Sequence, residues 1–263
     1  MKVQTRRLPL ALVAAVALIG AGAPMASADA SDTGPSVPTG LFTSPSSGET
    51  CGASAPYTTI GNTDVALGGT FADPAGGGLD AHFKIWPTGF GNGTDVAEQT
   101  IPVSSGTVGT LMVHTSVITQ LLADDGMTGT GTLSWTARTE HGSLASAWSA
   151  ECHFVFDGVR PSVAPGVVSP QFPDGSGGWP ANTGEARTPG TFTLSSGGVA
   201  DVVSYRYSTD WAPAVQTVAT TAGAPVDVTL TPPSAGPHTL SVYSVDAGGN
   251  RSDTFNYTFY ANA

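Results

Sequence analysis

The sequence predicts an all-β protein in which two β-sandwiches follow one another behind a signal peptide. Short runs of alternating apolar and polar residues recur about every 8 to 12 residues, with turn residues between them. The chain has 34 Gly and 20 Pro residues, and charged residues make only 11% of it, against roughly 25% in ordinary globular domains. A pair of runs also returns after about 105 residues, which is the length of one sandwich.

The first 28 residues have the features of a signal peptide. Three basic residues, Lys2, Arg6 and Arg7, precede the apolar run 8–23, and the small residues 26–28 provide a cleavage site. The run is short for a transmembrane helix. We therefore expect a secreted, extracellular protein without a membrane span. The adjacent arginines leave twin-arginine export open as the route.

Removal of this segment makes the chain more acidic. The full chain has 20 acidic and 9 basic residues and a net charge of −11. Three basic residues leave with the signal peptide, so 20 acidic and 6 basic residues remain, a net charge of −14. Such a surface repels nucleic acid and anionic lipid, and we expect no nucleic-acid partner. Solubility outside the cell explains the charge, and cation binding is the alternative.

The first module is expected over residues 36–158, after a flexible lead-in at 29–35. In the run 79–86, alternation directs Leu79, Ala81, Phe83 and Ile85 to the core and Trp86 to the opposite face. A short helical turn is expected at 116–123, before the breaker Asp124-Asp125-Gly126. An edge strand is expected near Leu41, and further strands at 65–71, 79–86, 95–103, 107–113, 132–138 and 152–156.

The second module is expected over residues 159–263. Its Pro/Gly-rich start, up to Gly190, is expected to be loosely structured. Strands with turns between them are then predicted at 191–196, 202–208, 214–220, 225–231, 238–246 and 253–260.

An internal repeat relates the two modules. The run Thr-Leu-Ser at 132–134 returns at 239–241, an offset of 107, and Phe154 returns as Tyr257, an offset of 103. The connection between the two runs is therefore four residues shorter in the second copy, where 246–250 makes the turn. In the first copy, Leu133 and Trp135 are expected in the core, while Thr136 faces outward.

These runs carry a resemblance to a known fold family. SWTARTEHG with the following SAWS resembles the last two strands of a fibronectin type III or immunoglobulin-like domain. Residues 190–260 are similar to the tandem immunoglobulin-like modules of secreted actinobacterial proteins, which often precede a laminin-G-like domain. The resemblance implies an immunoglobulin/fibronectin III-like sandwich and is weak for function. Ligand binding by a laminin-G-like domain is not carried over, because we expect no such domain within residues 1–263.

Cys51 and Cys152 are the only cysteines. Two cysteines in an exported chain are most simply paired as a disulfide. The bridge would close a loop of about a hundred residues and contribute roughly 4 to 5 kcal/mol on the chain-entropy model. A catalytic thiol or a metal-binding pair is the alternative.

Other motifs predict no catalytic residues, cofactor or metal. The five histidines form no zinc-binding helix pattern, and no nucleophile elbow occurs. Two acidic turns, at 124–126 and 246–250, have the oxygen ligands that calcium prefers. Turn capping by the side chains explains both equally well.

Four tryptophans, Trp86, Trp148, Trp179 and Trp211, are expected near loops or strand ends, and three of them, Trp86, Trp148 and Trp211, are the predicted contact residues. Exposed indoles stack on sugars or anchor protein partners, whereas packing against the neighbouring module is the simpler interpretation. We therefore predict a non-catalytic structural, adhesion or spacer protein, with an extracellular protein or a cell-envelope glycan as partner. The alternative function is carbohydrate binding through the loop tryptophans. A hydrolase assembled from distant loops is a third hypothesis.

Overall fold

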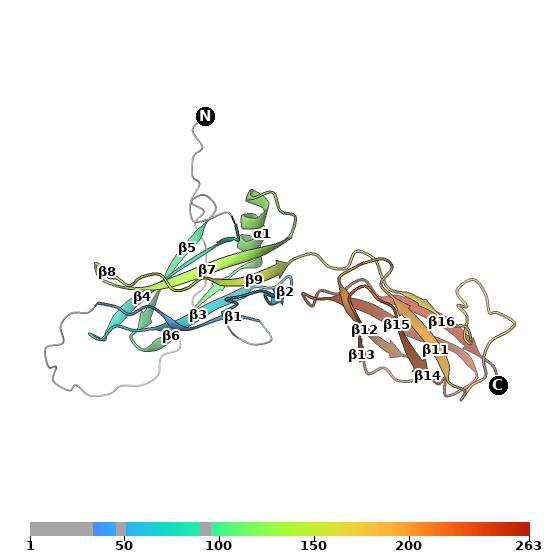
Figure 1. Cartoon of the computed structure of the whole chain (residues 1–263). Helices are drawn as coiled ribbons and strands as arrows, with labels where there is room; N and C mark the ends of the chain where they lie inside the picture. Colours follow the sequence, from blue (N-terminus) through green and yellow to red (C-terminus); the bar gives the residue numbers. More distant parts are fainter. Residues whose placement is uncertain (1–33, 46–50, 90–95) are drawn as a thin grey trace, which may run out of the picture. The chain divides into compact units, whose positions relative to one another are not determined.

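The computed structural model describes residues 34–45, 51–89 and 96–263. The predicted signal peptide and residues 29–33 of the lead-in lie outside the described residues. The chain divides between Gly158 and Val159 into two compact units (Figure 1). Among the described residues, no helix combines the length and the apolar composition needed to cross a membrane.

The first unit is a β-sandwich with one helix. Its smaller sheet has the order β1-β3-β6, and its larger sheet has the order β2-β9-β7-β4-β5, with β8 paired to β7. The smaller sheet consists of β1 (Thr39–Ser44), β3 (Val65–Phe71) and β6 (Thr107–Val113). The larger sheet consists of β2 (Thr59–Ile60), β4 (Gly78–Pro87), β5 (Ala97–Ser104), β7 (Thr130–His141), β8 (Leu144–Ala145) and β9 (Cys152–Asp157).

The core of the first unit lies between these two sheets. Alternation along β7 buries Leu133 and Trp135, as predicted. The indole Nε1 of Trp135 donates a hydrogen bond of 2.9 Å to Thr43 Oγ1 on β1, in the opposite sheet. Phe71 on β3 meets Phe83 on β4 edge to face, with ring centroids 5.5 Å apart. Aromatic contacts and a buried hydrogen bond therefore hold the two sheets together.

Helix α1 (Thr115–Asp124) connects β6 to β7 and confirms the expected helical turn. Its buried residues, Ile118, Leu121 and Leu122, pack into the core. Asp64 fixes its first turn, because Asp64 Oδ1 accepts a hydrogen bond of 2.8 Å from the backbone N–H of Thr115. That bond, together with the contact to His114, lowers the pKa of Asp64.

A disulfide cross-links the first unit. Cys51 and Cys152 are bonded, with their Cα atoms 4.8 Å apart and a separation of 101 in the sequence. The predicted pairing is confirmed, and Cys152 is buried in the core. The bridge ties the segment that follows β1 to the start of β9.

The second unit is a β-sandwich without a helix among its described residues. Its sheets have the orders β10-β11-β14 and β13-β12-β15-β16. Phe192 and Phe259 are fully buried between them, with ring centroids 5.2 Å apart. The strands are β10 (Gly166–Val168), β11 (Gly190–Ser195), β12 (Val202–Thr209), β13 (Gln216–Ala219), β14 (Val226–Leu230), β15 (Gly236–Asp246) and β16 (Phe255–Ala261).

The two units share one strand order. Strands β1-β3-β6 correspond to β10-β11-β14, and β5-β4-β7-β9 correspond to β13-β12-β15-β16. In the first unit Leu133 lies opposite Phe154, and in the second Leu240 lies opposite Tyr257. This register agrees with the repeat found in the sequence.

The segment 159–189 has more structure than its composition predicts. It contains β10 and the fully buried Phe172, and it then runs along the outer edge of β16. The N–H groups of Gly175 and Ala186 donate to the carbonyls of Thr258 and Asn262, each at 2.8 Å. The prediction of loose structure is therefore wrong. Its order comes from backbone hydrogen bonds, which leave no pattern in the side chains, and they cover a strand edge that would otherwise be open.

Candidate functional site

A pocket on the first unit brings two of the three predicted tryptophans together. It has a volume of about 170 Å³. Trp86 at the end of β4 and Trp148 beyond β8 both contribute to its wall. The indole of Trp86 is only 7% exposed, less than its predicted outward position suggests. The pocket is lined by Lys84, Trp86, Val96, Thr136, Trp148, Ser149 and Glu151.

Three charged or polar side chains hold the ring of Trp148. The Lys84 ammonium lies 4.8 Å from the ring centroid, and the Arg138 guanidinium lies 4.6 Å from it. The His82 ring meets the indole edge to face at 5.1 Å. Cations near an indole face are attracted by its quadrupole. The Trp148 ring is therefore fixed over β4 and β7, which carry these three residues.

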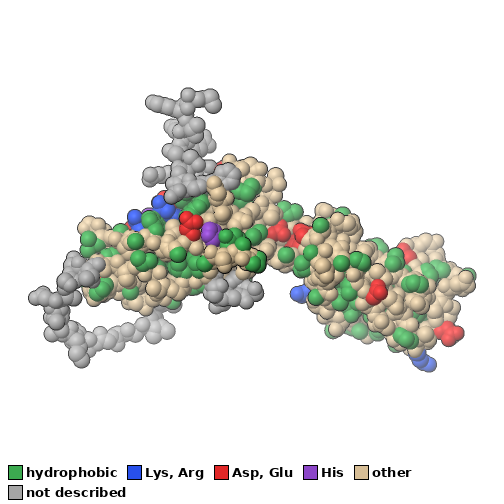
Figure 2. Space-filling view, in the orientation of Figure 1, with side chains coloured by type: hydrophobic (Ala, Val, Ile, Leu, Met, Phe, Trp, Pro, Cys, Tyr) green, Lys and Arg blue, Asp and Glu red, His purple; other side chains and the backbone are tan. Residues whose placement is uncertain are grey.

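An ion-pair network surrounds the same ring. His82 Nδ1 lies 2.8 Å from Glu140 Oε1, and His82 Nε2 lies 3.2 Å from Glu98 Oε2. Lys84 pairs with Glu98 at 2.9 Å, and Arg138 Nε donates to Glu140 at 2.7 Å. Figure 2 shows basic, acidic and histidine side chains close together on part of the surface of the first unit.

Both carboxylates in the network have lowered pKa values. For Glu140, the hydrogen bond with His82 lowers the pKa most; burial opposes this, and Arg138 lowers it further. For Glu98, burial raises the pKa, but the hydrogen bonds and charges of Lys84 and His82 outweigh it. Both groups are therefore ionised at neutral pH and hold their basic partners in place.

The connection that carries Trp148 is fixed along β7. Ser149 donates its backbone N–H to the Ala137 carbonyl at 2.8 Å and accepts the Ala137 N–H on its Oγ at 3.1 Å. Thr136, predicted to face outward from the core, is buried beneath it and donates to the Ser149 carbonyl at 3.0 Å. Thr136 is outside the core cluster, as predicted, but the segment with Ser149 covers it. Alternation shows which face a residue is on, but not whether a polar segment covers that face.

A hydroxyl–imidazole pair lies on the same sheet. Ser134 Oγ is 2.9 Å from His153 Nδ1 and 2.8 Å from Thr88 Oγ1. A hydroxyl next to a histidine is the start of a nucleophile–base arrangement. Ser134 is only 1% exposed, however, so a substrate cannot reach its oxygen. The pair satisfies buried polar groups between β7 and β9.

The third predicted tryptophan belongs to the second unit. The ring of Trp211 meets His238 at 4.9 Å and Phe259 at 6.2 Å, edge to face in both cases. Trp211 therefore packs against the core of its own unit. His238 in turn lies 3.0 Å from Asp210 Oδ2 through its Nδ1.

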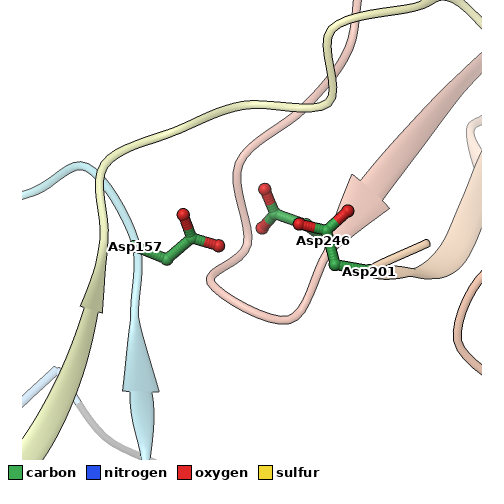
Figure 3. Close-up of side chains that lie close together, drawn as sticks. All are labelled: Asp157, Asp201 and Asp246. Carbon is green, nitrogen blue, oxygen red and sulfur yellow. The ribbon is translucent and has the colours of Figure 1, made fainter. Parts of the chain in front are cut away.

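The acidic turn that follows β15 is capped by its own residues. Asp246 Oδ1 accepts the Asn250 backbone N–H at 2.9 Å, and Oδ2 accepts the Asn250 amide at 3.1 Å. An oxygen of Asp201, which precedes β12, lies within 4.8 Å of one of Asp246 (Figure 3). Figure 3 also labels Asp157, which belongs to the first unit. Asp157 Oδ1 accepts a hydrogen bond from the Thr130 hydroxyl within that unit. The contacts to Asn250 are those of a capped turn.

Comparisons with known proteins give similarity at the level of structure. No family model matches the sequence, and no protein of curated function matches it. The chicken CNTN1 FN1–FN3 domains are 12% identical over 86% of this chain and 67% of that chain, with a TM-score of 0.45. The fibronectin(III)-like modules of Clostridium thermocellum CbhA are 13% identical over 79% of this chain and 92% of that chain, with a TM-score of 0.40.

The fold class follows from the strand order of the two units. Each unit packs a three-stranded sheet against a sheet built on four corresponding strands. The prediction of two immunoglobulin/fibronectin III-like β-sandwiches in tandem is confirmed. The signal peptide in front of them stays a prediction.

Proposed function

We propose that this chain is a secreted, non-catalytic protein whose two sandwiches serve as spacer or adhesion modules outside the cell. The main support is that each unit has its own pair of sheets and its own hydrophobic core. Modules of this kind keep their shape without help from a neighbour, and they set a distance between whatever is attached at either end. The disulfide fits an oxidising compartment, where such bonds persist.

This proposal is tested with the protein as its host exports it. Protein recovered from the culture medium is expected to begin at Asp29 and to have no reactive thiol under denaturant. Each unit is expected to unfold in its own transition. Retention of the intact chain in the cytoplasm would contradict the proposal, and so would turnover of a peptide or polysaccharide substrate by the pure protein.

Carbohydrate binding is a second candidate, supported by the pocket that contains Trp86 and Trp148. Indole faces pack against the apolar face of a sugar. The Lys84 ammonium donates hydrogen bonds and the Glu151 carboxylate accepts them, as ring hydroxyls require. The volume of about 170 Å³ is below the roughly 300 to 1,000 Å³ of sites for drug-sized ligands. The pocket therefore suits one sugar ring or a chain end.

A glycan array separates the two candidates. If the second is right, the wild-type protein binds defined glycans, and Trp148→Ala and Glu151→Gln weaken that binding about tenfold, a loss of about 1.4 kcal/mol. Leu144→Ala is the matched control, because Leu144 is exposed on β8 and does not line the pocket. Absence of wild-type binding to every glycan contradicts carbohydrate binding through this pocket and leaves the spacer role standing.

A further inference from the structure

Trp179 in the second unit is exposed in an unusual way. Its side chain is 52% exposed, and among the described residues it is the only aromatic in the group of exposed large hydrophobic side chains. Tryptophan is normally among the more buried residues of a protein. A large apolar ring that is left in solvent commonly marks a contact surface.

The backbone on both sides of Trp179 is held in a defined shape. Gly175 donates its N–H to the Thr258 carbonyl on β16 at 2.8 Å, and Gly178 donates to the Gly175 carbonyl at 3.0 Å. Asp174 accepts two hydrogen bonds from Ser176, one from the backbone N–H and one from the hydroxyl, each at 2.9 Å. The segment that carries the ring is therefore a fixed turn on the edge of β16.

Two neighbours fix the ring itself. Its centroid lies 5.5 Å from that of Tyr260 on β16, at an interplanar angle of 50°. The indole also rests on Gly175, where an added Cβ would come within 2.3 Å of two ring atoms. Only glycine at this position leaves room for the ring. The indole is thus positioned on the surface, outside the core cluster of the second unit, and it is preorganised for contact.

We infer that Trp179 and Tyr260 form an aromatic platform that binds the apolar face of a sugar ring in a neutral polysaccharide. The C–H groups of a pyranose carry slight positive charge and are attracted to the negative face of an aromatic ring. The net charge of −11 disfavours nucleic acid and anionic lipid. The turn next to the platform offers Asp174 and Ser176, whose oxygens accept hydrogen bonds from hydroxyl groups.

The surroundings favour a sugar over a protein partner. A specific protein interface buries about 1,200 to 2,000 Å² and surrounds its aromatic anchors with further apolar contacts. Trp179 is instead flanked by Gly177, Gly178 and Pro180, in a turn that also contains Ser176. The platform is an exposed surface, so it suits a ring within a polymer as well as one at its end. It is independent of the pocket in the first unit.

Affinity electrophoresis of the mature full-length chain tests this inference. Native gels contain hydroxyethylcellulose, xylan or glycol chitin, one polymer in each gel. At least one polymer is expected to retard the wild-type protein, and Trp179→Ala is expected to weaken that interaction about tenfold, with Trp179→Phe intermediate. Val215→Ala is the matched control, because Val215 is 53% exposed in the same unit but is not aromatic. Circular dichroism verifies that each variant is folded.

The outcomes separate this platform from the pocket. Retardation that persists in Trp148→Ala but is lost in Trp179→Ala supports the platform. Free migration of the wild-type protein in all three gels overturns the inference, and so does equal retardation of the wild-type protein and Trp179→Ala. Loss of binding to a protein or a phosphatidylcholine vesicle in Trp179→Ala, without any polysaccharide binding, also overturns it.

Discussion

The two units build the same sandwich, but they cover its larger sheet differently. In the second unit a tight turn at 246–250 leads from β15 to β16, whereas in the first unit β8 and the segment with Trp148 lie between β7 and β9. The first unit also adds α1 and the disulfide. Because the second unit forms the same strand order without these parts, they are additions to a common framework. The features specific to the first unit are therefore concentrated in them.

One small motif is the same in both units. Ser149 donates its N–H to the Ala137 carbonyl and accepts the Ala137 N–H on its hydroxyl oxygen. Ser252 makes the same two bonds with Ser244, at 3.0 and 2.9 Å. These residues are related by the repeat offsets of 107 and 103. In each unit, this serine bonds the connection before the last strand to β7 or to β15. The motif thus belongs to the common framework.

The residue before that serine distinguishes the units. It is Trp148 in the first unit, where the indole lies over the cations of Lys84 and Arg138. It is Arg251 in the second unit, where the guanidinium lies 5.5 Å from the ring of Tyr243. Both connections therefore use a cation–π contact, with the aromatic and the cation exchanged. Only the first arrangement gives the loop an indole that lines a pocket.

The largest expected difference between the units comes from the disulfide. Removing it in the double variant Cys51→Ala/Cys152→Ala is expected to destabilise the first unit by about 4 to 5 kcal/mol, because the bridge closes a long loop. The second unit keeps its stability. Hydrogen exchange followed by mass spectrometry measures both units in one sample. Equal loss of protection in peptides from both units would show that they do not unfold separately.

The serine motif is expected to contribute similarly to both units. Ser149→Ala and Ser252→Ala each leave a buried backbone N–H without its acceptor, at a cost of about 1 to 3 kcal/mol. Urea denaturation of the two variants gives both values. Ser146→Ala is a useful comparison in the first unit, since Ser146 repeats the pattern with Thr139 nearer the end of β7. If Ser149→Ala lowers stability and Ser252→Ala does not, the motif does not contribute in the same way to both units.

Acid is expected to affect the first unit more than the second. A carboxylate whose pKa is lower in the folded protein than in the unfolded chain stabilises the fold when the pH is above its unfolded pKa, which is 3.8 for Asp and 4.5 for Glu. This contribution is lost as the pH falls through the lower pKa of the folded state. Between neutral pH and about pH 3, the Tm of the first unit should therefore fall more than the Tm of the second unit. A larger fall in the Tm of the second unit would reverse the comparison. Among the described residues, the carboxylates with a lowered pKa are Asp64, Asp73, Glu98 and Glu140 in the first unit and Asp210 in the second.

Strand positions were largely predictable because each buried face leaves a period of two in the sequence. The run at 107–113 is β6 with the same bounds, and α1 extends one residue beyond its predicted range at either end. The disulfide also followed from cysteine count and export. These features depend on local pattern, or on residues so few that only one pairing exists.

The candidate sites were less predictable because they depend on how polar segments fold back. Trp86 and Trp148 were each recognised as possible contact residues, yet their shared pocket depends on Ser149 fastening the connection to β7. Trp179 was expected only near a loop, and its platform depends on backbone bonds to β16. One sequence signal was present, since Ser149 and Ser252 share the offset of 103 that relates Phe154 to Tyr257.

The smallest expected effect concerns the exchanged cation–π contact. Arg251→Ala removes the cation from Tyr243 at an exposed position, and the expected loss of stability in the second unit is about 0.5 to 1 kcal/mol. Arg251→Lys keeps a cation and should recover part of that loss, whereas Arg187→Ala removes an exposed arginine outside the strands of the same unit as a control for charge alone. Urea denaturation resolves the difference when all variants are compared in one buffer. If Arg187→Ala costs as much as Arg251→Ala, the Arg251 effect is one of net charge, and Trp148 and Arg251 then correspond in position but not in energetic role.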